Sequence, residues 1–225
     1  CLAVITVLAL LACQEKTMTA EKLIARCADA MGGQDNIENI KTLRIGAVYP
    51  DHGNHALFIE IKRPNLSYNP QSKIVFDGKR LCWTKGTDGN SAPELVDAEE
   101  WKDGEVEIGF YFPAFFDYPS EYLGMETVDV KKFYKLSVKL PLGAEMVYYV
   151  DAKTYLLHKA VAHLTLYGEA RHPERVFSDY KEIGGIRFPH GFTYGSRNGI
   201  MKGRIESVEI NAPMDDDHFQ IPDGF

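Results

Sequence analysis

The sequence predicts a mainly β protein with helices, of the α+β class, built as a single curved antiparallel sheet or half-open β-barrel of about eleven strands that covers short helices. Three observations predict this fold. From residue 41 onward, apolar and polar residues alternate over short stretches, which is the period of a strand. Short turns rich in Gly, Asp, Asn and Pro separate the stretches, so neighbouring strands should pair as an antiparallel meander. Aromatic residues, at 12% of the chain, favour strands over helices.

The composition is that of a globular protein. Its 225 residues are 45% hydrophobic, which is enough for a sizeable core. The net charge is −7, and Lys and Arg are scattered along the chain, so no nucleic-acid partner is expected. The sequence contains no internal repeat and no low-complexity linker, which predicts one domain over residues 19–225.

A targeting segment opens the chain. Leu2 to Ala12 is an uncharged run of 11 residues, too short for a bilayer span of about 20 residues but suited to the apolar part of a signal peptide. Because no Met precedes Cys1, we expect the start of the precursor to be missing. The run ends in Leu10-Leu11-Ala12-Cys13, which resembles a bacterial lipobox. The alternative is an ordinary secretory signal with an incidental cysteine.

The lipobox resemblance implies an address in the cell envelope. Residues 1–12 would be a cleaved signal peptide, Cys13 the lipid anchor that holds the protein to a membrane, and residues 13–18 a lipidated stalk. Gln14 stands where an Asp resembles an inner-membrane retention signal, so we expect the outer membrane of a Gram-negative cell, facing the periplasm. A disulfide is permitted there. Cys27 and Cys82, however, lie in a helical and a strand pattern, so two buried thiols are expected.

Helical signals are confined to three places. Thr19 to Met31 carries an apolar stripe at helical spacing, begins at a good N-cap and ends at a Gly pair. Asp35 to Ile40 predicts a short second turn, and Glu94 to Trp101 predicts a short helix. Strands are predicted at residues 43–49, 56–62, 66–68, 73–76, 79–85, 128–130, 133–139, 145–150, 155–166, 174–180, 186–194 and 200–210.

The most unusual stretch is Gly109 to Pro119, which holds six aromatics in eleven residues. Pro113 and Pro119 exclude a long helix or a central strand here, so a short and broken apolar element is expected. It either plugs the core or covers an apolar cavity. For the second case the candidate ligand-binding residues are Trp83, Trp101, Phe110, Phe112, Phe115, Phe116 and Tyr118.

Residue spacing does not favour an enzyme, a metal site or a cofactor. His52 and His55 fall in a turn with Asp51, and His158 and His163 point to opposite faces of one predicted strand. The acidic run at residues 215–218 is most simply a solvated connection. The sequence has no nucleophile elbow, no zinc-protease motif and no phosphate-binding Gly loop. A hydrolase remains open only if distant carboxylates and His meet in space.

Several motifs, taken in order, resemble the LolA-like outer-membrane lipoprotein-sorting family, and in particular its small lipoprotein relatives. They are Ala30 to Gly33, Ile40 to Leu43, Asp77-Gly78 before Trp83, Tyr149 to Thr154, Asp179-Tyr180, Gly185 to Pro189, Asn211, and Phe219 with Pro222. Each motif is mostly turn chemistry, and their order and spacing carry the resemblance. It spans about residues 19–222.

The resemblance implies an unclosed antiparallel barrel wrapped over helices, with an apolar cavity that binds lipid or the acyl chains of lipoproteins. The lipobox departs from the soluble carriers of this class, so an anchored protein is expected instead of a diffusing shuttle. The alternative is a structural or scaffolding lipoprotein of the same fold, whose filled core leaves an exposed apolar patch for an envelope protein partner.

Overall fold

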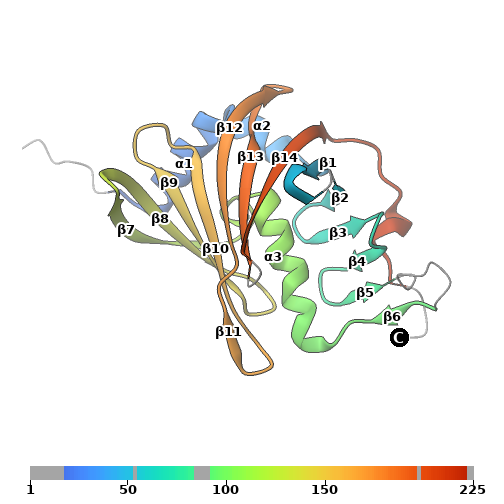
Figure 1. Ribbon diagram of the computed structural model, residues 1–225. Helices are drawn as coiled ribbons and strands as arrows, with labels where there is room; N and C mark the ends of the chain where they lie inside the picture. The colour runs from blue at the N-terminus through green and yellow to red at the C-terminus, as the bar shows by residue number, and fades with distance from the viewer. Residues whose placement is uncertain (1–17, 53–54, 84–91, 197–198, 222–225) are drawn as a thin grey trace, which may run out of the picture.

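The computed structural model describes residues 18–52, 55–83, 92–196 and 199–221 (Figure 1). Its helices are α1 (Ala20–Met31), α2 (Gln34–Asn39) and α3 (Trp101–Tyr111), with short 3₁₀ helices η1 (Pro50–His52), η2 (Ala98–Glu100), η3 (Ala114–Phe116) and η4 (Asp216–Phe219). The strands of its first half are β1 (Thr42–Tyr49), β2 (His55–Lys62), β3 (Leu66–Asn69), β4 (Ile74–Phe76), β5 (Leu81–Trp83) and β6 (Glu94–Leu95). Those of its second half are β7 (Ser120–Val128), β8 (Lys131–Lys139), β9 (Glu145–Asp151), β10 (Leu157–Leu166), β11 (Glu169–Arg171), β12 (Glu174–Ile183), β13 (Ile186–Ser196) and β14 (Gly199–Ile210).

The strands form one open antiparallel sheet, which confirms the predicted fold class. The order is β6-β5-β4-β3-β2-β1-β14-β13-β12-β10-β9-β8-β7, with β11 paired to β10. Two meanders, β1–β6 and β7–β14, are therefore joined by the pairing of β1 with β14. Within the described residues the order runs from β6 to β7 without these two strands pairing, so the sheet is not closed into a barrel. Figure 1 shows α3 lying between the two halves of the curved sheet.

Local signals define α1 as the sequence predicts. The Thr19 hydroxyl accepts a hydrogen bond from the Lys22 backbone N–H at 3.3 Å, and Gly32 ends the helix at a φ of 133°. The buried stripe consists of Leu23, Cys27, Ala28 and Met31. Cys27 and Cys82 are both buried and are not joined in a disulfide, as expected.

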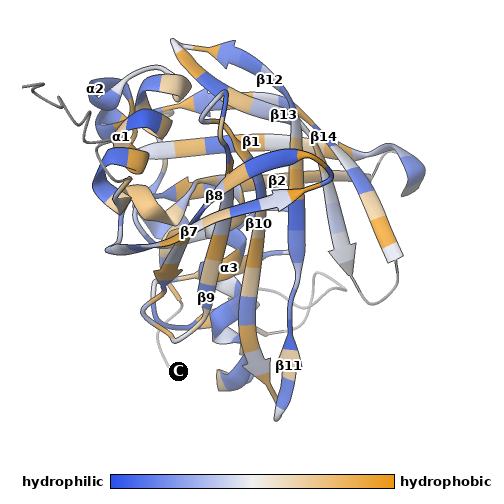
Figure 2. Ribbon diagram, turned by 90° about the vertical axis from the view of Figure 1, so that its left-hand side faces the viewer, coloured by the Kyte–Doolittle hydropathy of each residue, from blue (hydrophilic) through white to orange (hydrophobic). Residues whose placement is uncertain are grey.

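The core follows the alternation of the strands. Hydrophobic and hydrophilic residues alternate along the strands in Figure 2. The inward-facing hydrophobic side chains pack around α1 and α3. Leu43, Ile45, Ile61 and Leu136 are among its fully buried members. Among the described residues, no helix is both long enough and apolar enough to cross a bilayer.

The predicted helix over residues 94–101 is wrong. Glu94–Leu95 pairs with β5 as a strand, the Asp97 side chain caps η2, and the helix proper begins at Trp101. The sequence pattern does not predict α3 because the helix contains two glycines. Gly inside a helix is unfavourable by about 1 kcal/mol relative to Ala. Both are required by close packing. A Cβ on Gly104 would lie 2.4 Å from the Phe76 ring, and one on Gly109 would lie 3.1 Å from the Tyr148 hydroxyl.

The strand predicted over residues 128–130 is also misplaced. β7 ends at Val128, and Asp129 and Val130 form the hairpin turn to β8 with φ of 45° and 65°. The described residues form fourteen strands where about eleven were expected. The additions include β6 and β11, which are too short to show a period, and most of β7. Being at the edge of the sheet, β7 keeps apolar side chains exposed, so its pattern does not stand out.

Candidate functional site

The aromatic stretch lies at the C-terminal end of α3, where it breaks as predicted. Gly109 to Tyr111 complete the helix, Phe112 and Pro113 are extended, and η3 follows. Tyr148 of β9 ties the two parts together. Its hydroxyl donates to the Gly109 carbonyl at 3.0 Å and accepts from the Ala114 backbone N–H at 2.9 Å. The bend between α3 and η3 is therefore held from inside the core.

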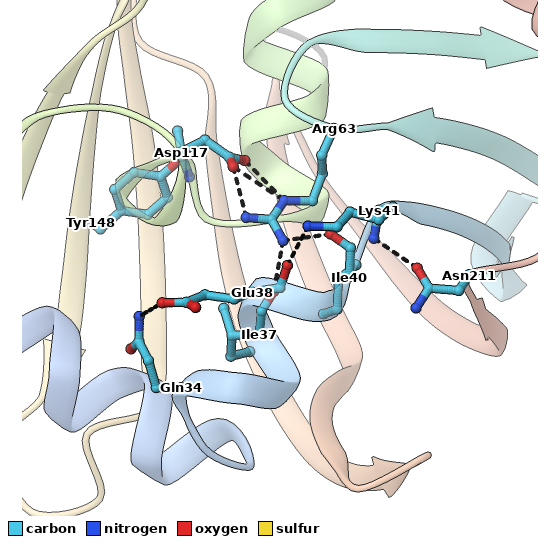
Figure 3. Close-up of polar contacts among 10 residues, drawn as sticks. Gln34, Ile37, Glu38, Ile40, Lys41, Arg63, Asp117, Tyr148 and Asn211 are labelled. Atoms are coloured by element: carbon cyan, nitrogen blue, oxygen red, sulfur yellow. Dashed lines mark hydrogen bonds and ion pairs between the residues drawn. The ribbon is translucent and has the colours of Figure 1, made fainter.

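A second tie joins this stretch to the helical end of the molecule (Figure 3). Asp117 accepts from Arg63, with Nη2 to Oδ1 at 2.7 Å and Nε to Oδ2 at 3.2 Å. Nη1 of Arg63 also donates to the carbonyls of Ile37 and Ile40, both at 2.7 Å. The guanidinium lies 4.3 Å from the centre of the Phe112 ring. One largely buried cation thus connects the end of β2, α2 and the aromatic stretch.

The structure brings most of the predicted ligand-binding aromatics together. Phe110, Phe112 and Phe115 are buried, and Phe116 and Tyr118 are half-buried. The rings of Phe115 and Phe116 are 4.6 Å apart, and the ring of Phe115 meets that of Tyr148 edge-on at 5.1 Å.

The two tryptophans lie away from this group. Trp101 is at the opposite end of α3, half-buried, with its indole N–H donating to the Val96 carbonyl at 2.8 Å. Trp83 is in β5, but its side chain falls outside the described residues, as does Cys13.

The space inside the curved sheet is distributed along α3. Beside the aromatic end only small cavities remain, of about 10 Å³ next to Phe112 and about 20 Å³ next to Phe110. The other end of the helix borders two larger clefts, of about 630 Å³ and about 230 Å³. The first is within the range of about 300–1,000 Å³ that is typical of ligand sites. Asp103 on α3 lines both.

The two clefts differ in their walls. The larger cleft lies against β10–β13 and is lined by Leu164, Leu166, Pro173 and Tyr194, with Arg171, His172 and Glu174 among its polar residues. The smaller cleft lies against β2–β5. Its lining residues from the sheet are Ile59, Ser67, Asn69, Ile74 and Leu81, and Gly104 and Glu107 join Asp103 from α3. Partial desolvation, followed by the nearby Glu100 and Glu107 carboxylates, raises the pKa of Asp103 above its ordinary value, although the residue keeps an exposed surface. Each cleft therefore combines apolar and charged lining residues.

A buried arginine stands between the clefts. Arg175 of β12 is 2% exposed, and its Nη2 lies 3.6 Å from Oε1 of Glu107. Four rings surround its guanidinium, at 4.4–5.8 Å to their centres. These rings, called the aromatic cage below, are Phe110, Tyr111, Phe192 and Tyr194. Burial works against the charge, but Tyr111, Glu107 and Tyr49 outweigh it and hold the pKa of Arg175 above its ordinary value.

Sequence reasoning missed Arg175, Glu107 and Asp103. One signal was available, because Arg175 shares a strand face with Phe177 and therefore places a charge on a face that is otherwise buried. No local sequence pattern singles out Glu107, because it faces Arg175 only through the packing of α3 inside the curved sheet.

Several histidines of the described structure contact a ring or a carboxylate. His158 stacks on Phe133 with ring centres 4.7 Å apart, and His163 meets His172 edge-on at 4.8 Å. His218 of η4 pairs with Glu60 at 2.8 Å. Within the described ranges, no three or more His, Cys, Asp and Glu side chains are placed to hold a metal ion. The side chains of His52 and His55 fall outside those ranges.

Comparisons with known proteins identify the fold. No protein-family model and no curated protein matches the chain. Among solved structures, a LolA superfamily protein from Nitrosomonas europaea aligns over 91% of this chain and 99% of its own, at 14% identity and a TM-score of 0.56. A DUF1329 family protein from Desulfovibrio piger aligns over 91% and 98%, at 11% identity and a TM-score of 0.52. The chain therefore has a LolA-like fold, as its motifs predicted.

Proposed function

We propose that this protein binds the acyl chains of a lipid or lipoprotein beside α3, inside the half-open barrel, while Cys13 anchors it to a membrane of the cell envelope. The observation that carries the proposal is the pair of clefts along α3, with their apolar walls. Burial of an acyl chain contributes about 0.8 kcal/mol per CH₂ group, so a short stretch of chain gives useful affinity without a charged partner.

The aromatic stretch acts as the apolar cover at one end of the binding space. It closes the end of the half-barrel opposite the two clefts, where the remaining cavities are too small for a ligand. Phe112, Phe115 and Phe116 then seal the apolar end of the half-barrel, and the ligand lies beside the other end of α3. The lipobox resemblance supports the anchor, with the outer membrane, facing the periplasm, as the address.

The direct test is organic extraction of the protein followed by lipid mass spectrometry. The protein should carry Cys13→Ala and lack residues 1–12, because the acyl chains of its own anchor would otherwise appear in the extract. We expect co-purified lipid, and binding of a fluorescent fatty acid to the extracted protein. An extract without lipid, together with no binding of the fluorescent fatty acid, contradicts the proposal.

A pair of variants locates the site. Asp103→Trp places a bulky side chain at the border of both clefts, and Glu99→Trp makes the same change at an exposed position of η2 that lines neither. Each variant removes one acidic residue near the start of α3. We expect the fluorescent fatty acid to bind Glu99→Trp as it binds the parent protein and to bind Asp103→Trp at least about tenfold more weakly. Equal binding by the two variants places the ligand elsewhere.

A second candidate function is a scaffolding lipoprotein that binds an envelope protein. Two observations favour it, namely the close packing around the aromatic stretch and a group of exposed apolar side chains on the β7–β8 hairpin. These side chains are Leu123, Met125, Val128 and Val130.

Phe116→Asp separates the two functions, because Phe116 is only half-buried within the aromatic stretch. A ligand-covering role predicts loss of retained lipid with the circular dichroism of the sheet unchanged. A filled core predicts that the variant unfolds.

A further inference from the structure

The Arg175 guanidinium makes few hydrogen bonds within the part of the protein that the structure describes. Its Nε and Nη1 are buried and have no hydrogen-bond partner among the residues that the structure describes. The Tyr111 hydroxyl is buried beside the same guanidinium and has no other hydrogen-bond partner among the described residues. A buried cation with unsatisfied N–H groups is strongly unfavourable unless something else completes its contacts. Arg175 and Tyr111 therefore leave hydrogen-bonding capacity unused at one place inside the half-barrel.

The surroundings of Arg175 hold the guanidinium in place without neutralising it. The aromatic cage offers ring faces, which attract a cation but accept no ordinary hydrogen bond. The only carboxylate within ion-pairing distance in the described structure is that of Glu107, at 3.6 Å, and the Glu107 side chain is 41% exposed. This distance is longer than the 2.7–2.9 Å of a charge-assisted hydrogen bond. Glu107 is thus a weak partner that can move away into solvent.

Residues that contact Arg175 line both clefts, although Arg175 itself lines neither. Tyr194, a member of the aromatic cage, lines the larger cleft, and Glu107 lines the smaller one. In each cleft one lining residue, Tyr194 or Glu107, separates the cleft from the guanidinium. The fork of an arginine matches the paired oxygens of a carboxylate or a phosphate.

We propose that Arg175 and Tyr111 bind the anionic headgroup of an amphiphile, a carboxylate or a phosphate, whose chain lies in the clefts along α3. This inference rests on the proposed lipid-binding function and specifies its substrate class. Glu107 occupies the position of the headgroup when no ligand is bound and competes with it. Asp103, at the rim of both clefts, opposes an incoming anion and so limits the affinity.

The test compares ligands that share a chain and differ in charge. The protein is again the Cys13→Ala chain without residues 1–12. One arm measures dissociation constants for oleate and oleyl alcohol, and the other for oleoyl lysophosphatidate and monooleoylglycerol. We expect at least one anion to bind about tenfold or more tightly than its neutral counterpart, as one charge-assisted hydrogen bond allows. The arm that shows the preference identifies the headgroup.

Two variants test the residues. Arg175→Met fills the same space without charge, and replacement of a buried ion by a hydrophobic residue is often tolerated. We expect it to remove the preference for the anion and to keep the affinity for the neutral ligand. Glu107→Gln changes a half-exposed side chain and removes the competing carboxylate. We expect it to tighten binding of the anion by about tenfold and to change the affinity for the neutral ligand by much less.

The outcomes separate this inference from the proposed function. If neither neutral nor anionic ligand binds, the proposed function fails and the inference fails with it. If both bind equally to the parent protein, the lipid-binding function stands and the role of Arg175 is refuted. If Arg175→Met does not fold, Glu107→Gln decides, because an unchanged affinity for the anion in that variant overturns the inference.

Discussion

Glu105 should make the stability of this protein fall as pH rises. It lies on α3, is 4% exposed, and accepts one hydrogen bond at Oε2 from the Leu142 backbone N–H at 2.8 Å. Its Oε1 is buried and has no partner among the described residues. Burial raises the pKa of Glu105 from 4.5 to about 7, although the bond from Leu142 opposes the shift. The folded state therefore favours the neutral carboxyl.

The linkage between folding and proton binding at Glu105 fixes the sign and the size of this pH dependence. Because the folded protein holds this proton more tightly than the unfolded chain, the stabilisation is complete below the ordinary pKa of 4.5 and is lost as pH rises through about 7. The difference between the two pKa values corresponds to about 3 kcal/mol. Glu105→Gln keeps the shape and the acceptor for Leu142 but cannot ionise. The variant should match the parent protein at pH 4.5 and exceed its unfolding free energy by about 3 kcal/mol near pH 7.5.

Urea unfolding followed by tryptophan fluorescence at several pH values between 4.5 and 7.5 measures this difference. Glu121→Gln, at an exposed position of β7, is the control and should run parallel to the parent protein at every pH. The difference between Glu105→Gln and the parent cancels the titration of all other groups. A difference that stays constant with pH refutes the reasoning, because Glu105 would then have the same pKa in the folded and unfolded states.

Three further changes should alter stability in urea unfolding. Asp117→Asn leaves the charge of the largely buried Arg63 without its carboxylate partner and should lower the unfolding free energy by about 3 kcal/mol. Asp216→Asn, in an exposed ion pair, is the control and should lower it by less than about 1 kcal/mol. Equal losses in the two variants would contradict this. Val130→Asn relieves a β-branched residue held at a φ of 65° and 95% exposed, and should raise stability by about 1 kcal/mol; a loss would show that Val130 makes a contact. Gly104→Ala should destabilise by about 1–3 kcal/mol through overpacking, although helix propensity alone predicts a gain.

Periodic patterns and turn chemistry predicted much of the fold. The N-cap at Thr19 and the Gly pair after Met31 set the ends of α1 by local contacts, so they were readable from neighbouring residues. The Asp151 turn is similar, since its side chain accepts from the backbone N–H groups of Lys153 and Thr154, both at 2.9 Å. The start of α3 was not readable, because Gly104 reflects packing against a distant ring and not a local preference.

The candidate site was likewise predictable only in part. The aromatic stretch was evident from composition, and its break at Pro113 follows from the chemistry of proline. The clefts were not evident from the sequence, because they lie where α3 meets strands from both halves of the sheet. The sequence alone determined a curved antiparallel meander with an apolar segment across it, since alternation and turns act over a few residues. Only the tertiary structure decided that Glu107 and Arg175 face each other between two clefts, because that contact depends on how the whole sheet curves around one helix.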